Sequence, residues 1–174
     1  MFLDNSLSFN GGWTSPQALT ATANGTTVLD VTGAGSGNAP AMVGGFPNTN
    51  NAIGDDWGLA DGEAIPWLYL AVTTAGTGTG TLVVSIQEAP DNGSYAPGTY
   101  TTVYTSTAFV GTSLTQGTVL TAQLPPRLPG TLPPRFYRIV YTVTGTFTAS
   151  VLAGLVLNPQ SSLTSGAYPR NFAG

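Results

Sequence analysis

The sequence predicts an all-β protein, an antiparallel jelly-roll β-sandwich of about eight strands. Glycine (23 residues) and proline (13 residues) divide the chain of 174 residues into short pieces, none long enough for a convincing amphipathic helix. Within these pieces apolar and polar residues alternate, and β-branched and aromatic residues are frequent, as in half-buried strands. This length suits one domain, which we delimit as residues 1–174.

The alternation places a strand in each of eight segments. The expected strands are 17–22, 26–31, 65–73, 81–88, 99–106, 118–123, 135–144 and 146–157. An Asn-Gly pair at 24–25 predicts a turn between the first two. Pro66 is acceptable near the start of its strand, and we expect Trp67 to lie in the core.

Three strands have a pattern clear enough to assign faces. Simple alternation over 99–106 puts Tyr100, Thr102 and Tyr104 on one face. In 135–144 we expect the face that carries Tyr137, Ile139, Tyr141 and Val143 to be buried, and Phe136 and Arg138 share the opposite face. In 146–157 the alternating apolar residues are Phe147, Ala149, Val151, Ala153 and Leu155.

Irregular segments flank these strands. We expect an extended N-terminal arm over 1–15, a long loop over 33–62 and a C-terminal tail over 158–174. The Gly-, Asn- and Pro-rich part of the loop, 33–61, is longer than most loops of compact domains, and such loops are usually functional or disordered. The Pro-rich segment 124–134 is expected to be an extended, stiff connector between two strands.

Composition excludes several functions. The chain contains no Cys, His or Lys, so the common metal ligands and the usual bases that activate a serine or threonine are missing. Its net charge of −4 with only four cationic residues, all Arg, argues against nucleic-acid binding. Only 7% of residues are charged, which suggests a surface partly covered by partners. The longest apolar run is too short to span a membrane, and residues 1–10 do not resemble a secretory signal. We expect no cofactor.

One acidic cluster leaves alternatives open. Asp55, Asp56 and Asp61 fall close together in the long loop, and Glu63 directly follows it. Carboxylates on a loop could hold calcium, or serve a glycosidase as acid and base. The spacing matches neither design well, and a solvated or partner-facing loop is the favoured interpretation. Replacing all four without losing hydrolysis would remove the enzyme hypothesis.

Arginine and tryptophan supply the remaining candidates. Arg135 and Arg138 flank aromatic residues and could pair with a partner's carboxylates, although local salt bridges are the simpler interpretation. Trp13 and Trp57 lie in irregular segments and are therefore candidates for contacts with a neighbour or for stacking on sugars.

Several segments together carry a resemblance to a known family. They are 2–7 (FLDNSL), 28–31 (VLDV), 67–72 (WLYLAV), 82–87 (LVVSIQ), 138–143 (RIVYTV) and 168–172 (YPRNF). In these strand patterns and termini the chain resembles the jelly-roll capsid cement, or decoration, proteins of short-tailed bacteriophages.

The resemblance implies a structural virion protein and not an enzyme. Such proteins bind the outer surface of an icosahedral head as homotrimers and bridge neighbouring major capsid protein subunits. We expect the arm, loop and tail to reach neighbours through Phe2, Leu3, Trp13, Phe46, Trp57, Tyr168, Arg170 and Phe172. On this interpretation, deleting 158–174 weakens capsid binding while the domain still folds. The alternative is a carbohydrate-binding jelly-roll module of a phage fibre or secreted protein.

Overall fold

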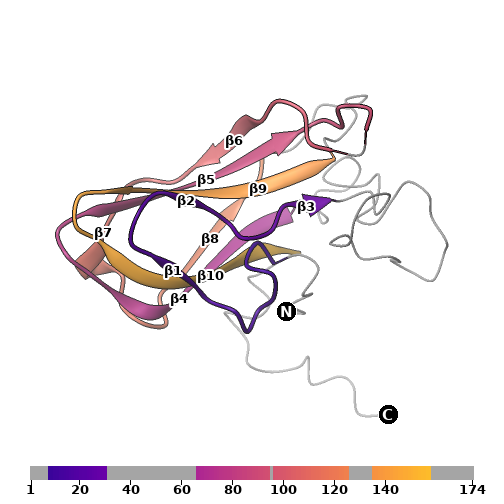
Figure 1. Ribbon diagram of the computed structural model, residues 1–174. Helices are drawn as coiled ribbons and strands as arrows, with labels where there is room; N and C mark the ends of the chain where they lie inside the picture. Colours follow the sequence, from indigo (N-terminus) through magenta and orange to yellow (C-terminus); the bar gives the residue numbers. More distant parts are fainter. Residues whose placement is uncertain (1–7, 31–65, 95, 126–134, 158–174) are drawn as a thin grey trace, which may run out of the picture.

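A computed structural model describes residues 8–30, 66–94, 96–125 and 135–157. Within them the chain forms two antiparallel sheets that pack face to face (Figure 1). The strands are β1 (Gln17–Leu19), β2 (Ala23–Asn24), β3 (Leu29–Asp30), β4 (Pro66–Thr77), β5 (Thr81–Ala89), β6 (Thr101–Thr105), β7 (Phe109–Val110), β8 (Val119–Gln123), β9 (Phe136–Thr144) and β10 (Thr148–Leu157), with a 3-10 turn at Gly111–Ser113. The all-β prediction is confirmed.

The strand order is that of a jelly roll. Sheet A has the order β1-β10-β4-β8, and sheet B has the order β2-β9-β5-β6. The short strands β2 and β3 both pair with β9, and β6 and β7 both pair with β5, so each couple is one interrupted edge strand. Counted in this way there are eight strand positions. Successive positions alternate between the sheets except for β5 and β6, which are neighbours in sheet B, and this is the arrangement of a jelly roll.

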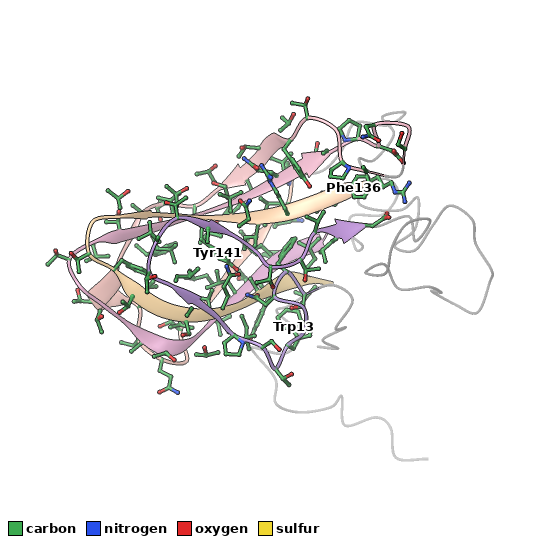
Figure 2. All side chains as sticks on the ribbon, in the orientation of Figure 1. Trp13, Phe136 and Tyr141 are labelled. Atoms are coloured by element: carbon green, nitrogen blue, oxygen red, sulfur yellow. The ribbon has the colours of Figure 1, made fainter. Side chains whose placement is uncertain are left out.

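Alternation along the strands builds the core between the sheets. From β9 it receives Tyr137, Ile139 and Tyr141, all at most 1% exposed, with Val143 packed at its margin. Figure 2 shows Tyr141 between the two layers. From β10 it receives Ala149, Val151, Ala153 and Leu155, and Phe147 joins them from the position just before this strand. Both face assignments made from the sequence are confirmed, because a pleated strand with one covered face must turn its apolar set inward.

The Asn-Gly turn prediction at 24–25 is wrong. Asn24 belongs to β2, and β1 and β2 lie in different sheets, so the chain crosses between the sheets before Asn24, at residues 20–22. Gly25 is instead required by close packing. Its amide donates to the Ile139 carbonyl at 2.9 Å, and a Cβ at this position would lie 2.5 Å from Ile139 Cγ2.

The face assigned to β6 is also wrong in part. Ile86 pairs with Tyr104, but the next residue, Gln87, pairs with Thr102, which leaves Val103 as the extra residue of a β-bulge. The bulge resets the alternation, so Tyr104 packs against the core with Ile86 while Thr102 lies outside with Gln87. Periodicity alone cannot reveal one inserted residue.

Of the arm predicted over 1–15, the structure describes the part from Ser8 onward. Ser8, Phe9 and Asn10 are buried against β10, where the Phe9 amide donates to the Ala153 carbonyl at 2.8 Å and the Asn10 Oδ1 accepts from the Ala153 amide at 2.6 Å. This segment therefore extends sheet A beyond β1. The predicted loop 33–61, the connector from 126 onward and the tail 158–174 lie outside the described residues.

Candidate functional site

The outer face of sheet A is apolar and aromatic. On β4 the alternation sends Leu68, Leu70 and Val72 into the core, so Trp67, Tyr69 and Ala71 face outward and are half-buried. The prediction that Trp67 lies in the core is therefore wrong. The run at 65–73 is apolar on both faces, and the core takes the leucines because they lie in register with inward-facing residues of β10 and β8.

Three cross-strand rows define this face. Trp67 lies between Val156 and Gln123, Tyr69 lies between Gly154 and Thr121, and Ala71 lies between Leu152 and Val119. Neighbours in such rows are in side-chain contact distance across the sheet. We call the three rows together with Trp13 the sheet A face.

Trp13 completes the sheet A face from a distant part of the sequence. The Trp13 ring meets the Tyr69 ring edge to face, with centroids 5.8 Å apart and an interplanar angle of 69°. Ser8 bridges to Gly154, which brings the loop before β1 alongside the row that contains Tyr69. Gly154 has no side chain, so β10 leaves room for a second ring beside Tyr69.

The outer face of sheet B has a different chemistry. Arg138 Nε donates to Gln87 Oε1 at 2.8 Å, and Gln87 Nε2 donates to Thr102 Oγ1 at 3.1 Å. The Arg138 guanidinium also lies over the Tyr100 ring, 3.7 Å from its centroid. Burial raises the pKa of Tyr100, and the charge of Arg138 partly offsets this increase. The polar groups of this face therefore bind one another.

A buried ion pair closes one end of sheet B. Arg135, immediately before β9, donates from Nε and Nη2 to the two carboxylate oxygens of Asp30 on β3, at 2.9 and 2.6 Å. Its Nη1 pairs with Asp91, and its guanidinium lies 5.0 Å from the centre of the Phe136 ring. The hydrogen bonds to Asp30 raise the pKa of Arg135 further above its usual value. Of the two interpretations of Arg135, the local salt bridge is the one observed.

Several candidate residues cannot be placed. Only Trp13 of the predicted contact residues falls in the described part of the chain; Phe2, Leu3, Phe46, Trp57, Tyr168, Arg170 and Phe172 lie outside it, as do Asp55, Asp56, Asp61 and Glu63. Sequence reasoning missed Trp67 and Tyr69 as surface residues. Alternation shows that the leucines of β4 and the aromatic residues between them lie on opposite faces, but it does not show which face is buried.

The described residues include a small cavity but no cluster of metal ligands. Among them, no three His, Cys, Asp or Glu side chains lie close enough together to hold a metal ion. A cavity of about 20 Å³ between Leu70, Tyr104 and Leu120 has room for about one water molecule. Across the same residues, no helix has the length and apolar character needed to cross a membrane.

Comparison with known proteins adds one match. The family model described as Bbp16 matches residues 13–156, which span both sheets and run from Trp13 almost to the end of β10. No curated protein matches the chain. The family name suggests a phage-related protein.

Proposed function

The chain belongs to the Bbp16 family, and we propose that it is a capsid cement protein of a tailed bacteriophage. In this role it binds the outer surface of the icosahedral head as a homotrimer and stabilises contacts between major capsid protein subunits. The jelly-roll body and the phage-related family name both support the proposal.

The observation that carries the proposal is the sheet A face. Charged residues are depleted from the centres of protein interfaces, whereas Trp and Tyr are enriched there. The sheet A face carries Trp13, Trp67 and Tyr69 and has no charged residue in any of its three rows. It has the composition of a surface that binds another protein, and we assign it to the head.

A rigid body is what a brace needs. Packaged DNA pushes the shell outward, and a protein that binds two subunits at once resists their separation. Each contact can be modest, because contacts made together raise the overall affinity through effective concentration. Binding to the assembled shell then stabilises it by mass action. A sandwich whose core side chains are almost all excluded from solvent transmits such a load without deforming.

A carbohydrate-binding module remains the second candidate, because aromatic residues on a jelly-roll sheet can also stack on sugars. The geometry of the ring pair favours the first candidate. Trp13 and Tyr69 meet at 69°, so they do not form the flat platform on which a sugar ring would stack. Glycan-array binding that is lost on replacing Trp13 would favour this alternative.

Co-sedimentation with cement-free, matured heads tests the proposal. The full chain should pellet with these heads at a saturating stoichiometry and raise the temperature at which they release DNA. Unexpanded heads are the matched control and should bind less, because expansion brings the bridged subunits into place. Sedimentation velocity of the free protein tests the trimer. Absence of binding to matured heads would contradict the proposed function.

A further inference from the structure

The two long sides of the sandwich are closed to different degrees. On one side, residues 8–10 and β1 cover the edge of β10, and β2 and β3 cover the edge of β9. On the other side sheet A ends at β8 and sheet B ends at β6, and no strand within the described residues pairs with either of them from outside. An open edge presents unpaired backbone groups to any strand that approaches.

The hydrogen bonds of β4 show which amides and carbonyls of β8 point toward β4 and which point toward the open edge. The Val72 amide donates to the Thr118 carbonyl and the Val72 carbonyl accepts from the Gly117 amide, both at 2.9 Å, so Val72 directs its backbone groups toward β8. Antiparallel ladders alternate, so Leu70 and Leu68 do the same and bond to their partners Leu120 and Ala122.

The intervening residues of β8 therefore face away from the sheet. They are Val119, Thr121 and Gln123, and each presents one amide and one carbonyl along the open edge. Within the described residues, this edge lacks three common protections of edge strands. β8 pairs with β4 over five consecutive residues without a bulge, and it contains no charged residue and no proline.

The β6 edge differs in a way that makes β8 the better docking strand. β6 carries the bulge at Val103, which interrupts its ladder and twists the edge. Apolar side chains also gather beside β8: Leu120 and Ala122 are only partly buried and lie with Tyr104 and Phe109 around the small cavity between the sheets. An added strand would cover them.

We infer that the β8 edge accepts an extended, uncharged strand of the protein to which this chain binds. This inference rests on the proposed function, in which that protein is the major capsid protein. The added strand would exchange backbone hydrogen bonds with Val119, Thr121 and Gln123 and would extend both sheet A and the sheet A face. β-Strand addition of this kind obtains its affinity from the main chain and its specificity from alternate side chains.

The size of the edge favours a strand of a larger partner over a second copy of this chain. A stable interface uses about 20–30 residues on each side, whereas β8 offers five. A capsid strand would join an interface already made by the sheet A face, and the contact would then benefit from a high effective concentration.

Thr121→Pro tests the inference in co-sedimentation with cement-free, matured heads. The Thr121 amide points away from β4, so proline removes an outward donor and leaves the β4–β8 ladder intact. We expect at least about a tenfold loss of affinity for heads. The matched control is Thr105→Pro on the β6 edge, where the amide also points outward because its neighbour Ser106 bonds to Val84; it should bind like the wild type.

The outcomes separate this inference from the proposed function. If the wild type binds heads and Thr121→Pro binds them with the same affinity, the strand docking is overturned and the proposed cement role is not. No wild-type binding overturns both. Self-association that Thr121→Pro abolishes, with head binding unchanged, would make a second copy the occupant and overturn the capsid assignment.

Hydrogen exchange covers the case in which Thr121→Pro does not fold. In the wild-type chain, the amides of Val119, Thr121 and Gln123 should exchange quickly when free and slowly when the protein is bound to heads. The inward amides of Leu120 and Ala122 are the internal reference and should be slow in both states. Unchanged fast exchange of the three outward amides on heads would overturn the inference.

Discussion

Both sheets turn alternate apolar side chains into the shared core, but their outer faces carry different kinds of residue. Sheet A has no charged residue in any of its strands, whereas every charged residue in the described part of the chain belongs to sheet B or directly flanks it: Asp30, Glu88, Asp91, Arg135 and Arg138. The outer polar groups of sheet B bind one another through Arg138, Gln87 and Thr102. The sheet A face instead presents aromatic rings.

This difference separates two requirements that one sandwich must meet. A face whose polar side chains hydrogen-bond to one another is stable in contact with water, and the outer face of sheet B is of this kind. A face of aromatic and small apolar residues gains free energy when another surface covers it, by about 25 cal/mol for each Å² of apolar area removed from water. The asymmetry therefore orients the molecule, with sheet A as the proposed partner side.

Arg135→Ala should have the largest effect, and it tests whether charge holds sheet B together. The substitution leaves Asp30 buried without its cation, and breaking a buried pair in this way costs about 3–5 kcal/mol. Urea denaturation followed by tryptophan fluorescence measures the loss. Arg138→Ala is the matched control on the half-buried face and should cost less than about 1 kcal/mol. If both variants lose the same free energy of unfolding, the buried Arg135–Asp30 pair does not stabilise the fold more than the half-buried contacts of Arg138 do.

Replacing Trp67 and Tyr69 by serine should have the next largest effect, and it tests whether the sheet A face is the partner side. Aromatic anchors at the centre of an interface contribute about 2 kcal/mol or more, so head binding should weaken at least ~30-fold. The matched double variant on sheet B, Gln87→Ala with Arg138→Ala, should bind heads like the wild type. The opposite ranking in the same co-sedimentation assay would reverse the orientation proposed for the molecule.

Tyr141→Phe should have the smallest effect, and it tests the core that both sheets share. The Tyr141 hydroxyl is buried near Asn10, and none of the described residues gives it a hydrogen bond of good geometry. Removing it should stabilise the fold by about 1 kcal/mol at neutral pH.

The same variant should change the response to alkaline pH. Burial raises the pKa of Tyr141 well above its ordinary value of 10.0, so above that pH the unfolded chain releases the proton more readily than the folded one. The associated stability is complete below pH ~10 and is lost as the pH rises further. The advantage of Tyr141→Phe over the wild type should therefore grow between about pH 9 and 11 in urea titrations. A constant difference would show that the hydroxyl does not titrate with unfolding.

Long, regular strands were predictable because their physics is local. β5, β9 and β10 alternate over nine or ten residues. All three strands followed from that period, and so did the buried faces of β9 and β10. The short strands β2 and β7, each of two residues, could not be recognised, because their pairing partners are remote in sequence. β3 falls within the strand expected over 26–31 but is only two residues long. The bulge at Val103 was hidden for a related reason: the partner strand decides which residue is left over.

The candidate site was predictable only in part. Trp13 was identified from its place in an irregular segment, but Tyr69, its contact, lies 56 positions away and was not singled out. Trp67 was assigned to the core because apolar residues occupy both faces of its segment. Local pattern cannot choose between two apolar faces; only the partner sheet does, by covering one of them.

The sequence by itself determined that this chain is a β-sandwich and that it lacks the His, Cys and Lys on which much of catalysis depends, because composition and a period of two are properties of the chain alone. Only the tertiary structure decided which face of β4 is covered, that the few charges gather around sheet B, and that β8 is left at an edge. These features depend on which strands become neighbours. In a jelly roll the neighbours are far apart along the chain, so the decision lies in long-range pairing.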